Sequence, residues 1–119
     1  MVMNLQSNGI FTHKGKSESL SYFEDLPISR KRKVAYMFEV LGDSGKIFNK
    51  EKFRNEGDQI YAIKASEDRF LCFFFDGAKI IVTNAYTKKS AKMPPREKEK
   101  ALKAKQDYNN RVKQGTYYE

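Results

Sequence analysis

Three consecutive apolar segments in the second half of the chain constrain the fold most strongly. The segments are "QIYAIK", "RFLCFFF" and "AKIIVTNAY", at 59–64, 69–75 and 78–86. The turn segment "ASED" separates the first pair, and Asp76-Gly77 separates the second. A glycine after aspartate permits the positive φ angles of a tight hairpin. The sequence therefore predicts an antiparallel three-stranded meander.

The middle segment of this meander, 69–75, is apolar without alternation. An edge strand open to water would alternate between apolar and polar positions. We therefore expect the middle strand to be central and to be covered on both sides over part of its length.

Two helices are predicted before the meander, and they can cover one of its faces. In the first, Ser17 is a candidate cap, Leu20 and Phe23 share a face, and Pro27 stops the helix. The second helix follows within 29–45, where apolar residues recur at helical spacing: Val34, Met37, Phe38 and Leu41.

The ends of the second helix also have sequence signals. Ser29 is a plausible N-cap, and either Gly42 or Gly45 would end the helix. The basic run Arg30–Lys33 reads as the solvated beginning of this helix, with contact to phosphate as the alternative.

A final, heavily charged helix is predicted from near Pro94. Residues that precede proline are pushed away from helical angles, so Met93 and Pro94 should be extended and the helix should start at or just after Pro95. Its thin apolar seam consists of Ala101, Ala104, Tyr108 and Val112. Two acid-first pairs four residues apart support an exposed helix: Glu99 with Lys103, and Asp107 with Arg111.

These elements together predict an α+β domain. A weak strand at Asn8–Lys14 comes first, followed by the two helices, the meander and the last helix. The segment Lys46–Asp58 has no clear period. We expect a single domain at 1–119, because a chain of this length supports one core.

Charge and composition indicate the partner class. A net charge of +8 suggests an anionic partner, most often nucleic acid, although a soluble basic protein is the plainer reading. No segment has the apolar length of a signal peptide or a membrane span, so no membrane partner is expected. The single cysteine, Cys72, and the single histidine, His13, offer no metal-ligand spacing, and neither a metal nor a cofactor is predicted. A lone cysteine also suggests a reducing cytoplasm.

The hairpin geometry groups polar residues at one end of the meander. With a four-residue loop at 65–68 and a two-residue loop at 76–77, Lys64 lies opposite Arg69 and Arg69 lies opposite Asn84. Tyr86 shares their face, because side chains two apart point the same way.

Two cations on neighbouring strands repel each other unless an anion lies between them. A phosphate suits Lys64 and Arg69, because Arg binds it through two hydrogen bonds and Lys as a point charge. In the alternative, both residues line an exposed hairpin end and pair with Glu67 or Asp68. Further lysines extend the positive surface toward the last helix: Lys88, Lys89 and Lys92.

The chain resembles the RelE/HigB superfamily of bacterial toxins, in particular its HigB-like, phage-associated branch. The residues that carry the resemblance are "NEGDQIYAIK", "RFLCFFFDGAKIIVTNAYTKKSAKMPPREKEKA" and the preceding helix pair, over roughly Ser17–Arg111. The most specific part is the junction Lys92–Glu97, and Lys64 stands where that branch commonly has Arg. The resemblance implies a RelE-like fold and a toxin of a type II toxin–antitoxin system. Such a toxin enters the ribosomal A site, cuts mRNA and is restrained by a cognate antitoxin.

The residues and the resemblance together suggest metal-independent RNA cleavage, in which the ribose 2′-OH is the nucleophile. Arg69 and Lys64 would stabilise charge on the phosphate, while Tyr86 and Lys88 would move protons or position the 2′-OH. No general base is evident, since the pKa of an ordinary Lys or Tyr is near 10. The ribosomal RNA backbone would be held by Lys89, Lys92 and Arg96.

Two other functions remain open from the sequence. One is a non-catalytic, basic nucleic-acid-binding protein of the same fold, and the other is a phage-encoded interaction protein that docks on an acidic host partner. For the toxin, an exposed cationic face predicts an acidic or helical antitoxin segment that covers it. We expect that antitoxin to contain a helix-turn-helix.

Overall fold

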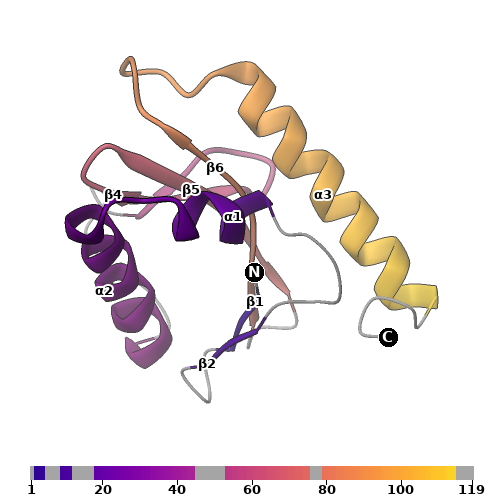
Figure 1. Cartoon of the computed structure of the whole chain (residues 1–119). Helices are drawn as coiled ribbons and strands as arrows, with labels where there is room; N and C mark the ends of the chain where they lie inside the picture. The colour runs from indigo at the N-terminus through magenta and orange to yellow at the C-terminus, as the bar shows by residue number, and fades with distance from the viewer. Residues whose placement is uncertain (1, 5–8, 12–17, 45–52, 76–78, 115–119) are drawn as a thin grey trace.

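One antiparallel sheet with three helices forms the fold, in a computed structural model that describes residues 2–4, 9–11, 18–44, 53–75 and 79–114 (Figure 1). The helices are α1 (Glu18–Glu24), α2 (Ile28–Ser44) and α3 (Pro95–Gln114). The strands are β1 (Val2–Asn4), β2 (Gly9–Phe11), β3 (Phe53–Asn55), β4 (Tyr61–Ala65), β5 (Asp68–Phe75) and β6 (Lys79–Thr87). This arrangement is the mixed α+β class that the sequence predicts.

The sheet contains more strands than the predicted meander. Its order is β2-β1-β6-β5-β4-β3, so β4, β5 and β6 are the expected meander and β3 extends it to four antiparallel strands. β3 lies in the segment without clear period and was not predicted. β1 was also not predicted, whereas β2 covers the described part of the expected strand at 8–14. His13 lies outside the described residues.

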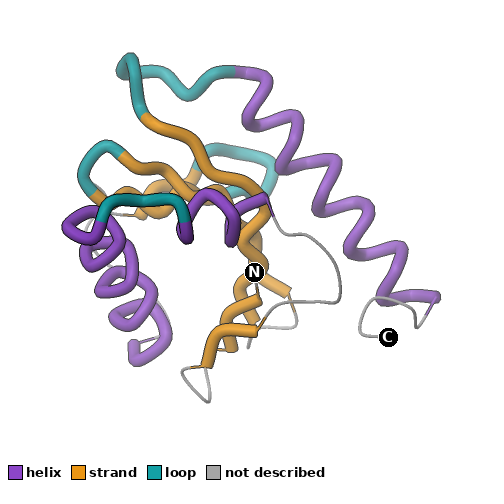
Figure 2. The backbone as a smooth tube through the Cα atoms, viewed as in Figure 1, coloured by secondary structure: helices purple, strands orange, loops and turns teal. Residues whose placement is uncertain are grey.

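Helices cover both faces of the sheet (Figure 2). β5 is central, and its side chains alternate between two cores, as its continuous apolar sequence predicts. On the α1 and α2 face, Phe70 meets the ring of Phe38 edge to face, with centroids 5.3 Å apart. On the α3 face, Phe73 meets Tyr108 in the same way at 5.6 Å. Cys72 is buried in the first core, and burial raises the pKa of its thiol.

The boundaries of α2 correct two predictions. The backbone carbonyl of Pro27 accepts the first helical hydrogen bond, from the N–H of Lys31 at 2.8 Å, so α2 starts at Ile28. Ser29 therefore lies in the first turn and is not the N-cap. Gly42 lies inside the helix, which continues to Ser44, and the other candidates at the helix ends, Ser17 and Gly45, lie outside the described residues.

The expected apolar faces of α2 and α3 are confirmed for the side chains that the structure describes, and the side chain of Leu41 lies outside these. Val34, Met37 and Phe38 are buried, and they belong to the core under α2. α3 starts at Pro95 as predicted. Along its seam Ala101 and Tyr108 are buried, Ala104 and Val112 are half-buried, and Arg111 Nε pairs with Asp107 Oδ2 at 3.1 Å. No helix in the described ranges has the length and apolar character to cross a membrane.

The strand register confirms one predicted pairing and corrects another. Lys64 pairs with Arg69 as expected, although Ala65 and Asp68 also pair, so the turn is shorter than the predicted four-residue loop. Arg69 lies opposite Tyr86, because Phe75 pairs with Lys79 and a further irregularity follows Leu71. The expected pairing of Arg69 with Asn84 is therefore wrong by two residues. A shift of two preserves the face of every side chain, so the polar residues stay together.

Candidate anion-binding site

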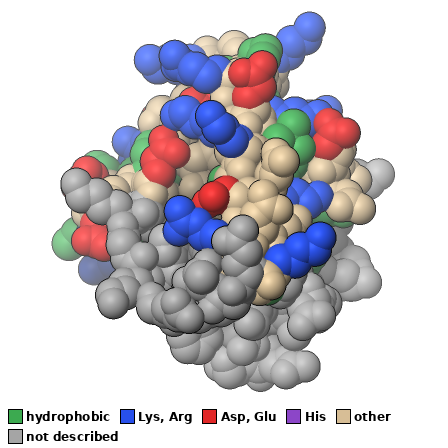
Figure 3. Space-filling view, turned by 90° about the vertical axis from the view of Figure 1, so that its right-hand side faces the viewer, with side chains coloured by type: hydrophobic (Ala, Val, Ile, Leu, Met, Phe, Trp, Pro, Cys, Tyr) green, Lys and Arg blue, Asp and Glu red, His purple; other side chains and the backbone are tan. Residues whose placement is uncertain are grey.

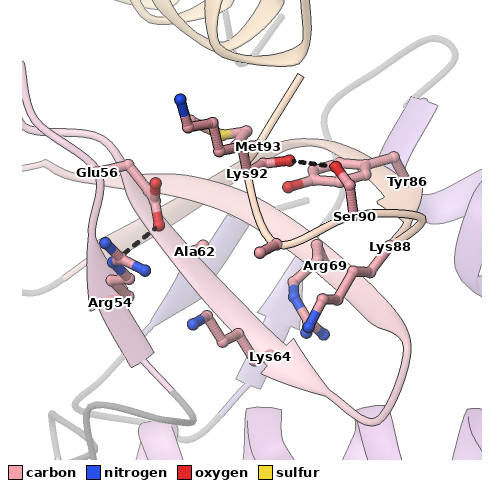
Figure 4. A pocket seen from close by; sticks show the side chains of 11 residues that line it. Arg54, Glu56, Ala62, Lys64, Arg69, Tyr86, Lys88, Ser90, Lys92 and Met93 are labelled. Carbon is pink, nitrogen blue, oxygen red and sulfur yellow. Dashed lines mark hydrogen bonds and ion pairs between the residues drawn. The ribbon is translucent and has the colours of Figure 1, made fainter. Parts of the chain in front are cut away.

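A cationic pocket lies between the β4–β5 end of the sheet and the connection from β6 to α3 (Figure 4). It encloses about 250 Å³. The lining contains five basic side chains and one carboxylate. The lining residues are Arg54, Glu56, Ala62, Lys64, Arg69, Tyr86, Lys88, Ser90, Ala91, Lys92 and Met93. An excess of fixed positive charge in a concave site suits an anionic ligand.

Three of the predicted site residues form one row across the sheet. Lys64 on β4 pairs with Arg69 on β5, and Arg69 pairs with Tyr86 on β6. Directly opposed residues of antiparallel strands have their Cβ atoms within about 5.5 Å, so the three side chains converge on the same face. Lys88 joins them from the end of β6, where its N–H donates to the carbonyl of Glu67 at 2.7 Å. Figure 4 shows the Lys88 side chain extending toward the Arg69 guanidinium.

The β4–β5 turn orients Arg69. Its Nη1 donates to the carbonyl of Ser66 at 2.7 Å and to the carbonyl of Asp68 at 3.0 Å. Ser66 has a positive φ of 58°, which turns the chain tightly enough for this contact. A guanidinium has five N–H donors, so the bonds from one nitrogen leave the others for a ligand.

The alternative in which Lys64 and Arg69 pair with neighbouring acids is wrong. Among the described residues, the ion pairs of Glu67 and Asp68 go to Arg30 instead. Over the same ranges, no ion pair of Lys64 or Arg69 occurs. Their charges therefore face the pocket without a carboxylate in direct contact.

The pocket shifts the pKa of two of its side chains in opposite directions. Burial lowers the pKa of the Lys64 ammonium, and the charges of Arg54 and Arg69 lower it further. Burial raises the pKa of the Tyr86 phenol, and the charge of Glu56 adds to the rise. The phenol therefore holds its proton at neutral pH and can donate it in a hydrogen bond, while the amine releases its proton more readily than an exposed lysine does.

A buried polar network supports the pocket from the opposite face of the sheet. The fully buried Asp68 carboxylate accepts from Tyr22 Oη at 2.7 Å and from Arg30 Nε at 3.1 Å. Because the single proton of Tyr22 goes to Asp68, the hydroxyl of Thr87 donates to Tyr22, at 2.6 Å. Arg30 therefore neutralises the buried Asp68 and is not merely a solvated residue at the start of α2. The network fixes both strand ends from which Arg69 and Lys88 emerge.

Asn84 has a different position from the one predicted. It shares the α3 face with Tyr86 but does not line the pocket, since it is only 1% exposed. Its amide donates to the side-chain Oε1 and to the backbone carbonyl of Glu97, both at 3.1 Å. These bonds attach the first turn of α3 to β6 and so fix the connection that carries Lys88 and Lys92.

The predicted RNA-binding residues divide into two groups. Lys92 lines the pocket, whereas Lys89 and Arg96 are exposed beyond its lining. Figure 3 views the side that carries α3 and shows basic side chains spread over this face, with acidic side chains between them.

Sequence reasoning missed two charged pocket residues, Arg54 and Glu56. Arg54 lies on β3, and its Nε is 3.6 Å from Glu56 Oε1. The N–H of Glu56 donates to the carbonyl of Ile60 at 2.8 Å, which closes the turn between β3 and β4. Glu56 directly follows β3, and no sequence signal marked these two residues, because the segment that contains them has no clear period. Among the described residues, no cluster of acidic, His or Cys side chains could hold a metal ion.

The family model described as "Phage derived protein Gp49-like (DUF891)" matches residues 21–106. These residues include the whole of the pocket lining and both supporting networks. The family is of the RelE/HigB-like toxin type. No curated protein matches the chain.

Proposed function

The chain belongs to the Gp49-like family of phage-derived proteins, and from this membership and its cationic pocket we propose a toxin that cleaves mRNA on the ribosome. The proposed toxin belongs to a type II toxin–antitoxin system and has a RelE-like fold. It uses the substrate 2′-OH and acts in the cytoplasm. The observation that carries the proposal is the row of Lys64, Arg69 and Tyr86 in a pocket whose cations face inward.

The pocket has the size and charge to hold one phosphodiester group. Its volume of about 250 Å³ accommodates a phosphate with part of a ribose. Arg69, oriented by the turn carbonyls, would contact two phosphate oxygens, and Lys64 would add a second positive charge. Both charges act where negative charge grows as the 2′-oxygen attacks phosphorus.

Glu56 supplies the proton acceptor that the sequence did not reveal. It is the one carboxylate among the residues lining the pocket. Its ion pair with Arg54 holds it at the rim. We assign it the proton of the 2′-OH as the 2′-oxygen–phosphorus bond forms.

A second proton transfer protonates the leaving group. As the phosphorus–5′-oxygen bond breaks, Lys88 donates a proton to the 5′-oxygen, and Tyr86 donates a hydrogen bond to the phosphate. The products are a 2′,3′-cyclic phosphate and a 5′-OH, so atoms and charge balance without metal or cofactor. DNA lacks the 2′-OH and would not be cleaved.

The proposed partners follow from the same surface. The ribosome presents the mRNA, and exposed cations on the connection to α3, with Lys89 and Arg96 among them, contact ribosomal RNA. A neighbouring antitoxin, which we propose contains a helix-turn-helix, covers the cationic face. Co-purification of that protein and rescue of growth test this part, and it fails if the neighbouring product neither binds nor restores growth.

Induced expression in a bacterial host, followed by primer extension on cellular mRNA, tests the activity. We expect growth arrest and cuts only in translated regions. Arg69→Ala should reduce cleavage on the order of two to three decades, while circular dichroism and antitoxin binding persist. Arg69→Lys should keep only part of the cleavage activity, since lysine lacks the planar pair of N–H donors with which arginine contacts two phosphate oxygens.

The control is Arg111→Ala, which removes an exposed arginine from α3 outside the pocket. Near-normal cleavage by a folded Arg69→Ala protein would refute the site. Cuts on naked RNA would indicate a free ribonuclease instead. Binding of RNA without any cleavage would support the non-catalytic alternative.

The role of Glu56 has its own test. Glu56→Gln keeps the shape of the side chain and removes its basicity, so cleavage should fall and the acidic limb of the pH–rate profile should disappear. A Glu56→Gln protein with an unchanged profile would mean that another group accepts the proton.

A further inference from the structure

A second hollow lies on the other side of the β4–β5 turn, on the face that α2 covers. It encloses about 450 Å³. Its lining residues come from α2 and from the turn: Arg32, Lys33, Tyr36, Met37, Ala65 and Ser66. Its floor consists of two apolar side chains, Met37 and Ala65, which are 7% and 3% exposed. The rim carries two basic side chains and an aromatic ring.

The side chain of Tyr36 is mostly exposed to solvent. Its exposed fraction is 64%, the highest of the described aromatic side chains. Neither Arg32 nor Lys33, which lie beside it on α2, forms an ion pair within the described residues. An accessible aromatic face flanked by unpaired cations is the combination that binds single-stranded nucleic acid, by stacking a base and holding the adjacent phosphates.

The second hollow and the anion-binding pocket share one turn. Lys64 and Arg69 line the pocket, whereas Ala65 and Ser66, two of the four residues between them, line the hollow. Lys64 and Ala65 are consecutive residues whose side chains point to opposite faces of the sheet, so the two sites open on either side of this turn. Ser66 also joins them directly, because its carbonyl holds Arg69 Nη1 at 2.7 Å.

We propose that this hollow, the Tyr36 subsite, binds a nucleotide of the single-stranded RNA whose phosphodiester lies in the pocket. The base stacks on Tyr36, and Arg32 and Lys33 hold the phosphates beside it. An RNA strand that passes over the turn would contact both sites. This inference rests on the proposed function only in taking the ligand to be the same RNA strand, and its test does not depend on cleavage.

The test is fluorescence anisotropy of a labelled 2′-O-methyl RNA octamer, which binds but has no free 2′-OH to react. Tyr36→Ala should weaken binding on the order of 5- to 150-fold, the range for loss of one stacked base. Tyr36→Phe keeps the ring and should bind like the unaltered protein. The matched control is Ile28→Ala, on the same helix and 67% exposed, which should change nothing.

The phosphate contacts are tested by salt dependence. Replacing Arg32 and Lys33 together by Gln should reduce the slope of log affinity against log salt by about 1.4, at roughly 0.7 per phosphate contact. The control replaces Lys103 and Lys113, two exposed lysines of α3, in the same way and should leave the slope unchanged.

The outcomes separate this inference from the proposed function. Unchanged binding by Tyr36→Ala, equal loss in Tyr36→Phe, or failure of the unaltered protein to bind the octamer overturns the subsite. A surface that serves a protein partner instead would give the first of these results. If Tyr36→Ala weakens octamer binding but translated mRNA stays intact in cells that express the unaltered protein, the subsite stands and the proposed cleavage fails. If only Arg69→Ala weakens binding, the pocket stands and the subsite fails.

Discussion

Asn84→Ala should destabilise the protein by an amount that its buried contacts determine. The amide loses one hydrogen bond to the Glu97 carboxylate and one to the Glu97 carbonyl. A hydrogen bond to a charged group contributes about 2 kcal/mol and one between neutral groups about 1 kcal/mol, so the loss is about 3 kcal/mol. The substitution also removes Asn84 Oδ1, which accepts from the Thr83 hydroxyl at 2.6 Å, but that hydroxyl can donate instead to the carbonyl of Leu71 at 3.2 Å, so we count only the two bonds to Glu97.

The assay is urea unfolding followed by far-ultraviolet circular dichroism, because the chain contains no Trp to report by fluorescence. For a domain of this size, about 3 kcal/mol corresponds to a fall in Tm of about 12 °C. The slope with urea should stay unchanged, since the fold and its buried surface are kept.

A paired substitution tests the physical cause. Asn84→Leu alone leaves a buried carboxylate without its donor, whereas Asn84→Leu with Glu97→Met replaces both partners by apolar side chains of similar shape. The double variant should therefore be more stable than the sum of the two single changes predicts. Additive losses, or a loss below about 1 kcal/mol in Asn84→Ala, would refute the argument that this pair attaches α3 to β6.

Three further predictions concern the residues around the pocket. Tyr22→Phe removes the hydroxyl that bridges two hydrogen-bond partners and should lower the free energy of unfolding by about 1 kcal/mol, measured in urea. Replacing Lys88, Lys89 and Lys92 together by Gln should weaken ribosome association in sedimentation assays and flatten its salt dependence, with Tm nearly unchanged because all three are exposed; normal association or unfolding would contradict this. The pKa of Lys64 is lower in the folded protein than in the unfolded chain. As the pH rises toward 10.5, the Lys64 amine is therefore more fully protonated in the unfolded chain, and its contribution to the free energy of unfolding rises with pH in this range. Lys64→Gln should lack that rise in thermal melts across the alkaline range.

The sequence predicted elements where local pattern and tertiary packing agree. The meander, the covered central strand and the start of α3 at Pro95 each follow from runs of residues that allow one arrangement. The pairing of Lys64 with Arg69 followed in the same way from a short turn. The three-residue strands β1 and β3 were missed, because so few residues carry no detectable period.

The errors in the site have a common physical origin. The register of β5 with β6 depends on the pairing of Phe75 with Lys79 at the turn and on an irregularity after Leu71, and each shifts the expected pairing by one residue, so the partner of Arg69 was predicted two residues away. The side chains that satisfy Asp68 come from α1 and α2, far away in sequence, and only the folded chain brings them together. For the same reason Glu56 was missed, since its place in the pocket depends on β3 joining the sheet edge.

The two faces of the β4–β5 end have complementary electrostatic roles. Strand alternation directs Asp68 toward the helices and the next residue, Arg69, toward the pocket. If Asp68 faced Arg69, the carboxylate would cancel the charge that an anion needs. Arg30 instead neutralises Asp68 behind the sheet, with Nε 3.1 Å from Oδ2, and the Asp68 side chain is fully buried there. The acid thus fixes the turn without forming an ion pair with Arg69, and the pocket keeps an excess of positive charge in front of a buried carboxylate.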